Sequence, residues 1–288
     1  MLDNSSFVSI SNLTKAQSLT PCPFPNSIPD DEIQLWCVMD EDIEDADFVH
    51  QNEAHLSDSE RERAGRFYRQ RDRNCFVIGR GIMRRALGAY YSIEPRDAPI
   101  LQNRYGCPEI SISVPKPIRF NVSHTDGIVA IAFATRRKLG VDVERICLDF
   151  SYLEVAQRQF PRSAWADLEG LREPLRRVRF YEYWVLLEAY AKSTGKGLFL
   201  PLGDIAFEFD KVDQSIIHFK ATNVISEHRQ FWLTGPSPDC RLAIAASGEE
   251  GRLVVRRLRP QLAETVHLPV LASGKKQEPF RLRRCMTL

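Results

Sequence analysis

Apolar and polar positions follow two periods along the chain, and together they predict a mixed α+β fold. Short apolar runs, some alternating with polar residues, predict strands. These lie at residues 33–39, 109–114, 120–124, 128–134, 140–144, 205–209, 218–222, 230–233 and 242–246. Apolar residues three or four positions apart predict helices at residues 57–67, 72–88, 153–160 and 178–193, with another after Pro161. This mixture indicates small, mainly antiparallel sheets packed against helices.

The predicted elements occur twice in the same order. In each half a strand is followed by a pair of helices and then by further strands. A repeat of about 110 residues suggests two pseudo-symmetric lobes with a site in the cleft between them. We place the N-terminal lobe at residues 32–137 and the C-terminal lobe at residues 138–248. Because one chain supplies both lobes, we expect a monomer.

The two ends of the chain differ from the lobes in composition. Residues 1–31 are rich in Ser, Asn and Pro, and prolines forbid a regular helix there. We therefore expect a flexible N-terminal arm. Residues 249–288 are basic and interrupted by prolines, which predicts a variable tail without a defined function.

Composition excludes several classes of protein. A hydrophobic content of 43% and a charged content of 27% are ordinary for a soluble globular protein, and the net charge of +1 gives no argument for nucleic acid. The first 30 residues lack a signal peptide, and no apolar run reaches membrane-spanning length. Seven cysteines without C-x-x-C spacing form neither a zinc motif nor a disulfide framework. We expect a cytoplasmic protein without a membrane or nucleic-acid partner.

The motif Gly140-Val141-Asp142-Val143-Glu144 places two acids on one face of a predicted strand. Their carboxylates should lie about 7 Å apart along the strand, where like charges repel. A hard cation with oxygen ligands, such as magnesium, is the simplest way to relieve that repulsion, and it leaves positions for phosphate. The alternative is a strand edge that faces solvent.

Three further features could bind anions or move protons. Nine arginines lie between residues 60 and 85, against three acids, and arginine clusters favour phosphate unless they form only a solvated helix face. His124 ends a strand beside a turn, so it should face solvent or ligand. Glu188 and Lys192 lie one helical turn apart, as a functional pair or as a surface ion pair.

Three stretches together resemble the signature of the 4′-phosphopantetheinyl transferases, specifically the two-lobed monomeric Sfp-type branch. They are Phe120-Asn121-Val122-Ser123-His124, the acidic motif at residues 140–144, and Trp184-x-x-x-Glu188-x-x-x-Lys192-x-x-Gly195-Lys196-Gly197-Leu198. The resemblance covers about residues 33–247. It implies an enzyme that transfers the 4′-phosphopantetheine group from coenzyme A to a serine of an apo acyl or peptidyl carrier protein, releasing adenosine 3′,5′-bisphosphate.

The resemblance also implies roles for individual residues. Asp142, Glu144 and Glu188 would hold magnesium against the coenzyme A pyrophosphate, and either Glu188 or a metal-bound water would take the serine proton. Lys192 would stabilise or protonate the leaving phosphate. The coenzyme A contacts that it implies are Arg63, Gln102, Asn103, Arg104, Tyr105, Gly106, Cys107, Asn121, Ser123 and His124. Ser123 and His124 would contact the nucleotide's phosphates, and Arg63 the region of the 3′-phosphate.

The chain departs from the family pattern at two positions. Cys107 stands where the family usually has the lysine of Gly-Lys-Pro, and Leu187 stands where it usually has lysine before the glutamate. Losing both cations should weaken coenzyme A binding unless Arg104 compensates. Two alternative functions remain. The chain could be a non-catalytic module that binds an acidic carrier or coenzyme A, or a magnesium-dependent nucleotide hydrolase.

Overall fold

The computed structural model describes residues 23–112, 114, 116–196, 202–221, 228–248, 251–260, 262–266, 268 and 270–275. Within these ranges it contains two large sheets. The first has the strand order β12-β11-β1-β5-β4 and the second the order β13-β9-β10-β6. The first comprises β1 (Glu32–Met39), β4 (Ile118–Thr125), β5 (Ile128–Thr135), β11 (Arg252–Arg259) and β12 (Leu262–Thr265). The second comprises β6 (Leu139–Arg145), β9 (Arg229–Thr234), β10 (Cys240–Ser247) and β13 (Val270–Lys275).

Helices and two small hairpins complete the described part of the fold. The helices are α1 (Glu41–Glu44), α2 (Ala46–Glu53), α3 (Asp58–Ala64), α4 (Gln70–Tyr91), α5 (Tyr152–Gln159), α6 (Arg162–Gly170) and α7 (Leu175–Ser193), with short 3-10 turns at Pro95–Asp97 and Leu202–Asp204. The hairpins pair β2 (Ile100–Gln102) with β3 (Pro108–Ile110), and β7 (Ile205–Phe209) with β8 (Ile217–Ala221). The helix predicted to end at Gly88 continues to Tyr91, where Ser92 ends it in the left-handed conformation.

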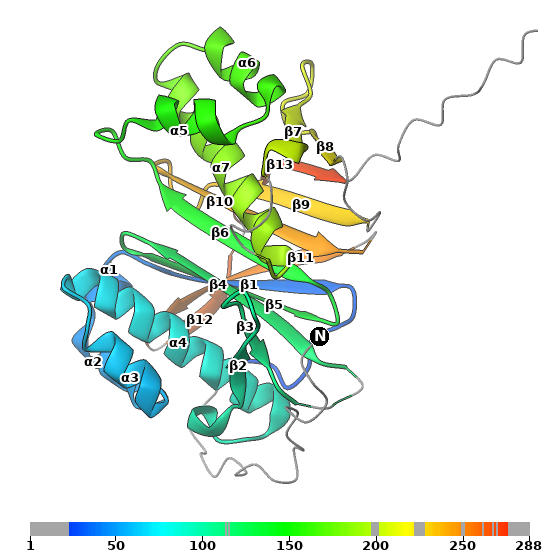
Figure 1. Ribbon diagram of the computed structural model, residues 1–288. Coiled ribbons are helices and arrows are strands. Elements are labelled where there is room, and N and C mark those ends of the chain that lie inside the picture. The colour runs from blue at the N-terminus through cyan, green and yellow to red at the C-terminus, as the bar shows by residue number, and fades with distance from the viewer. Residues whose placement is uncertain are drawn as a thin grey trace, which may run out of the picture.

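The two halves of the chain share a topology, which confirms the predicted α+β fold with repeated element order. The first sheet contains the run β1-β5-β4 and the second the run β6-β10-β9, so in each the last strand of the repeat lies in the middle. Helix α4 lies with α1–α3 beside the first sheet, and α7 lies with α5 and α6 beside the second (Figure 1).

A core between the two sheets holds the halves together. Alternate residues of β1, β5, β6 and β10 are buried in one cluster, which contains Leu35, Ala130, Val141 and Ile244. The opposite faces of these strands pack against α4 in the first half and against α7 in the second. Every residue of β5 is buried, because this strand is covered on both faces. The layers are therefore helices, sheet, sheet and helices.

The segment that the sequence predicts to be a variable tail instead contributes strands to both sheets where the structure describes it. β11 pairs in parallel with β1, and β13 pairs with β9. The arginines of β11 are tolerated in a sheet because acids of the first half neutralise them. The pairs are Arg252 with Glu32 (2.7 Å), Arg257 with Asp42 (3.1 Å) and Arg257 with Glu41 (3.0 Å).

The predicted N-terminal arm also differs from the structure over its last part. Residues 1–22 lie outside the described residues. Phe24 and Ile28 are buried in the core of the first half, and the Phe24 ring lies 4.6 Å from that of Trp36. Apolar side chains thus anchor a segment in which prolines exclude a helix. No helix in the described ranges is long and apolar enough to cross a membrane.

Candidate active site

The predicted site residues meet where the edge strands of the two sheets lie side by side. β4 ends the first sheet and β6 ends the second, and side chains rather than a backbone ladder join them. Three alternate residues of β4 form this connection, here called the polar ladder. It joins Asn121 Oδ1 to the Val141 amide (3.0 Å), Ser123 Oγ to Asp142 Oδ1 (2.9 Å) and Thr125 Oγ1 to Glu144 Oε2 (3.4 Å). The two-residue period of each strand thus sets the spacing of the site.

Helix α7 brings the remaining acid and the lysine to this seam. It packs closely on β6 at Gly140, where a Cβ atom would lie 2.0 Å from the Ala189 carbonyl oxygen and 2.5 Å from the Ser193 amide nitrogen. Only glycine permits this approach. It places Glu188 and Lys192, one turn apart on the helix, beside Asp142.

Lys192 forms a tight three-way contact with the first acid and the ladder serine. Its Nζ lies 2.6 Å from Asp142 Oδ1 and donates to Ser123 Oγ at 3.0 Å. Asp142 is only 3% exposed. Its second oxygen, Oδ2, is buried and has no hydrogen-bond partner among the described residues. Of the two alternatives for Glu188 and Lys192, the surface ion pair is not formed, because Lys192 pairs with Asp142 on β6.

The other two acids are poorly stabilised as carboxylates. Burial and then the charge of Asp142 raise the pKa of Glu144 to about 7, although Lys192, Thr125 and Trp184 act in the opposite direction. Burial and then Asp142 also raise the pKa of Glu188, whose Oε1 is buried without a hydrogen-bond partner among the described residues. Three crowded acids and one ammonium group leave a deficit of positive charge.

The donor chemistry of this cluster suits a hard divalent cation. Asp142 Oδ2 and Glu188 Oε1 are buried carboxylate oxygens without partners, and such oxygens are the ligands that magnesium prefers. Within the described ranges, no three His, Cys, Asp or Glu side chains are already gathered closely enough to hold an ion. The acids nevertheless suit a metal ion, because carboxylate oxygens are hard ligands and two of these oxygens have no hydrogen-bond partner among the described residues.

The hairpin that carries most of the predicted coenzyme A contacts reaches the end of α7. Asn103 Oδ1 accepts hydrogen bonds from the Tyr105 and Cys107 amides (2.9 and 3.0 Å), and Asn103 Nδ2 donates to the Gly195 carbonyl (3.1 Å). Gly106, with a φ of +81°, makes the turn. The side chain of Asn103 is therefore used to shape the loop and join it to α7.

Residues 105–108 line a cavity of about 190 Å³ together with Asn121, Val122 and Lys192. Gln102 and Arg104 are exposed, and the Arg104 guanidinium lies 4.7 Å from the Tyr105 ring centre. Leu187 is 2% exposed and belongs to the core of the second half. It points away from the polar site, so the family's lysine at this position has no counterpart here.

A group of cations lies beside Lys192 on the side of the first half. The His124 ring is exposed, yet desolvation by nearby protein and then the charge of Lys192 lower its pKa, with smaller effects of the same sign from Arg63 and Arg80. Both guanidinium groups lie over the Phe76 ring, at 5.1 and 5.7 Å. Arg80 was not singled out from the sequence, although its position four residues after Phe76 on α4 places the two side chains on one helix face.

A larger cavity, of about 490 Å³, opens on the other side of Glu144 and was not foreseen from the sequence. Its walls are mostly apolar. They comprise Thr125, Asp126, Glu144, Arg145, Ile146, Cys147, Phe150, Val155, Phe180, Tyr181 and Trp184. Phe180 and Trp184 lie four residues apart in the sequence and so share a helix face, but which cavity they line depends on how α7 packs.

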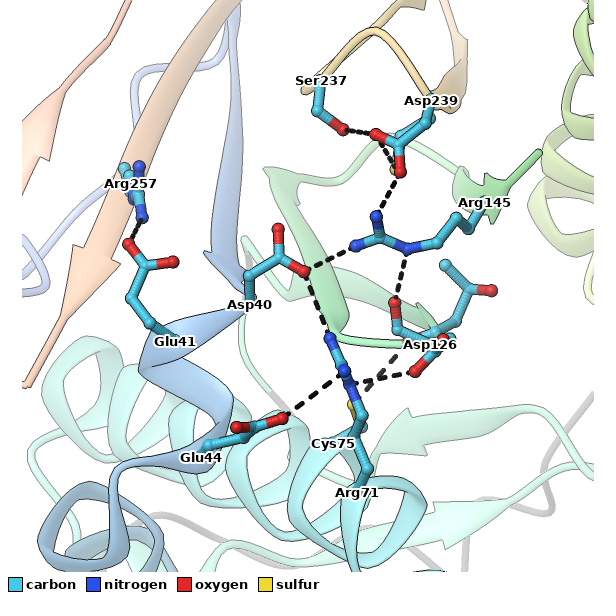
Figure 2. A network of polar contacts seen from close by, with 12 residues as sticks. Asp40, Glu41, Glu44, Arg71, Cys75, Asp126, Arg145, Ser237, Asp239 and Arg257 are labelled. Carbon is cyan, nitrogen blue, oxygen red and sulfur yellow. Dashed lines mark hydrogen bonds and ion pairs between the residues drawn. The ribbon is translucent and has the colours of Figure 1, made fainter. Parts of the chain in front are cut away.

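An ion-pair network at the rim of this cavity locks the two halves together (Figure 2). Arg145, at the end of β6, contacts Asp40 Oδ1 (2.6 Å), Asp239 and the Asp126 carbonyl (2.9 Å). Arg71 of α4 meets the same Asp40 oxygen at 3.2 Å. Asp40 has a φ of +40°, a strained conformation for a residue with a side chain. The network fixes the β4–β5 turn against β6, next to Glu144.

The raised pKa of Glu144 predicts a pH-dependent stability of the metal-free protein. Because the folded pKa of about 7 exceeds the ordinary value of 4.5, this group's stabilising contribution is complete below 4.5 and is lost as the pH rises through 7. The melting temperature of the wild-type protein, relative to that of Glu144→Gln, should therefore fall between about pH 5 and pH 7.5. Thermal melts of both proteins without divalent metal test this. Parallel curves for the two proteins would contradict it.

Comparison with known proteins identifies the family of the chain. Residues 138–245 match the family model of the 4′-phosphopantetheinyl transferase superfamily, and residues 45–136 match that of the 4′-phosphopantetheinyl transferase N-terminal domain. The 4′-phosphopantetheinyl transferase HetI of Nostoc sp. is 30% identical over 187 residues, which cover 62% of this chain and 75% of HetI. The 4′-phosphopantetheinyl transferase Sfp of Bacillus subtilis is 31% identical over 147 residues, covering 51% of this chain and 63% of Sfp, slightly less than two thirds of its length.

Among solved structures, a holo-(acyl-carrier-protein) synthase from Bacillus anthracis, in complex with CoA (3′,5′-ADP), matches 40% of this chain and 96% of its own. The TM-score is 0.34 at 17% identity, a likeness too slight to support an argument about this chain. The two family matches and the identity to HetI do support one. The chain belongs to the 4′-phosphopantetheinyl transferase superfamily and is of the Sfp type.

Proposed function

We propose that this chain transfers the 4′-phosphopantetheine group of coenzyme A to a serine of an apo acyl or peptidyl carrier protein and releases adenosine 3′,5′-bisphosphate. One observation carries the proposal beyond family membership. Lys192, Asp142 and Ser123 are in mutual contact, and Asp142 and Glu188 each hold a buried carboxylate oxygen that has no hydrogen-bond partner in the described ranges. Such a cluster has unmet capacity for a cation and a phosphate.

In the proposed reaction the serine oxygen attacks the β-phosphorus of coenzyme A. The new bond joins serine to phosphopantetheine, and the bond to the bridging oxygen breaks. Glu188 suits the role of the base that takes the serine proton, because its raised pKa makes the carboxylate more basic than usual. Asp142, Glu144 and Glu188 would hold magnesium, which when bound neutralises charge on the pyrophosphate.

Cations of the chain would bind the rest of the donor. Lys192 lines the 190 Å³ cavity and could stabilise the departing phosphate. Arg63, with Arg80 beside it, supplies the positive charge that suits the 3′-phosphate, and His124, whose pKa these cations lower, lies next to them. The hairpin residues 102–107 would contact the nucleotide. Since Cys107 and Leu187 supply no charge, exposed Arg104 is the neighbouring cation available to compensate.

Intact-protein mass spectrometry tests the proposal directly. We expect an apo carrier protein, incubated with the purified chain, magnesium and coenzyme A, to gain about 340 Da, the mass of the phosphopantetheine arm. The same carrier with its acceptor serine replaced by alanine should gain nothing. Coenzyme A binding without any gain across acyl and peptidyl carriers would indicate a non-catalytic relative. Release of adenosine 3′,5′-bisphosphate without carrier would indicate a hydrolase.

The remaining parts of the proposal follow from the architecture. One chain supplies both halves of the seam between β4 and β6, so a monomer suffices for the site. Carrier protein, coenzyme A and magnesium are the proposed partners, and the cytoplasm the proposed location. Size-exclusion chromatography with light scattering would test the monomer.

A further inference from the structure

Ser123 occupies the central position of the polar ladder, and its hydroxyl both donates and accepts a hydrogen bond inside the protein. Its one proton is directed at Asp142 Oδ1 (2.9 Å), and its oxygen accepts from Lys192 Nζ (3.0 Å). The residue is 7% exposed. A hydroxyl has a single proton to donate. While it bonds Asp142, it cannot also donate to a phosphate.

This arrangement makes the two oxygens of Asp142 unequal. Oδ1 accepts from Ser123 on β4 and from Lys192 on α7, while Oδ2 is buried without a hydrogen-bond partner in the described ranges. Two donors on separate elements hold one oxygen and so fix the plane of the carboxylate. The direction of Oδ2 is fixed as a consequence. Residues that hydrogen-bond a metal ligand in this way orient the ligand and tune the affinity of the site for the metal.

We propose that Ser123 is a positioning residue that holds Asp142 Oδ1 so that Oδ2 is presented to the divalent cation. The inference rests on the proposed function, because it assumes that Asp142 is a metal ligand. The orientation of the metal ligand Asp142, in the second half of the chain, then depends on the side chain of Ser123, in the first half.

The rest of the ladder supports this dependence. Asn121 bonds the backbone amide of Val141 and so fixes the register of β6 against β4 one step before Asp142. Thr125 bonds Glu144 one step after it, through a longer contact of 3.4 Å. Ser123 is the ladder residue that contacts both an acid of β6 and the lysine of α7. Its loss should therefore affect Asp142 more than a general loosening of the strands would.

Metal and donor binding, measured separately, test the inference. Ser123→Ala should weaken Mn²⁺ binding, measured by electron paramagnetic resonance without coenzyme A, by about 10- to 100-fold. Its affinity for coenzyme A in the absence of metal, measured calorimetrically, should stay at the wild-type value. In the transfer assay the magnesium concentration for half-maximal rate should rise. Ser123→Thr, which keeps the hydroxyl, should restore Mn²⁺ binding.

Thr135→Val is the matched control. It removes another buried hydroxyl, whose Oγ1 donates to the Ile28 carbonyl (3.0 Å) away from the site. It should lower thermal stability without changing Mn²⁺ affinity, so a similar loss of Mn²⁺ binding in both variants would overturn the inference. So would a Ser123→Ala protein that binds Mn²⁺ like wild type but, in the absence of metal, binds coenzyme A more weakly.

If the wild-type chain transfers the arm and Ser123→Ala needs no more magnesium, the inference fails while the proposed function stands. If the wild-type chain loads no carrier, the function fails, and the Mn²⁺ titrations still decide the role of Ser123.

Discussion

Glu188→Gln should lower phosphopantetheine transfer by at least about a hundredfold and leave the metal-free protein as stable as wild type or more stable. Burial and then repulsion from Asp142 raise the pKa of this glutamate, and its Oε1 has no hydrogen-bond partner among the described residues. A neutral amide of the same shape removes the repulsion. It also removes the basic oxygen and the anionic metal ligand that the proposed reaction requires.

Glu182→Gln is the control, for which we expect the opposite effects on stability and transfer. Glu182 lies on the same helix, but its carboxylate pairs with Arg179 (2.9 Å) and Arg241 (3.3 Å). Its neutralisation should lower the melting temperature and leave transfer unchanged. Carrier-loading rates and thermal melts of both variants separate a functional acid from a structural one. Equal losses of transfer in the two proteins would refute the role assigned to Glu188.

Gly140→Ala should destabilise the protein by about 1–3 kcal/mol or more and also reduce transfer. The added Cβ would meet backbone atoms of α7, the Ala189 carbonyl oxygen at 2.0 Å and the Ser193 amide nitrogen at 2.5 Å. Backbone cannot rotate away as a side chain can, so α7 must move off β6. That movement shifts Glu188 and Lys192 relative to Asp142, and a misplacement of about 1 Å can cost a hundredfold in rate.

Gly170→Ala is the corresponding control at the end of α6. A Cβ atom there has nothing within 4 Å, so the substitution should be neutral or slightly stabilising. Urea unfolding and carrier loading measure both quantities for the two variants. Gly140→Ala with the stability and rate of Gly170→Ala would show that α7 and β6 do not depend on this close approach.

The secondary structure of the two lobes could be predicted because periodicity is a local property. The acidic motif of β6 shows why the site could be predicted only in part from the sequence. Alternation at residues 140–144 predicts two acids on one strand face, but it does not say which strand lies opposite. The pairing of Ser123 with Asp142 arises because β4 and β6 end their sheets at the same place. That juxtaposition depends on the packing of two sheets across a shared core.

The strands near the C-terminal end were missed for a different reason. β11 reads Arg-Leu-Val-Val-Arg-Arg-Leu-Arg, and its charges indicate a solvated segment when considered alone. The acids that compensate them, such as Glu32 and Asp42, lie more than 200 residues away in the sequence. Electrostatic complementarity at that separation has no local signal. The same limit applies to Arg80, whose neighbour His124 comes from another element.

The placement of β11 and β13 bears on how the chain must assemble during synthesis. β1 is among the first described segments to be made, yet its parallel partner β11 is made more than 200 residues later, and β9 waits for β13. Each sheet therefore carries an unpaired edge until residues 252–275 have been made. Contacts so distant in sequence close slowly, and open strand edges are prone to aggregate in the interval. We therefore expect ribosome-bound chains that stop before residue 251 to depend on chaperones, even though most of the site's residues have already been translated.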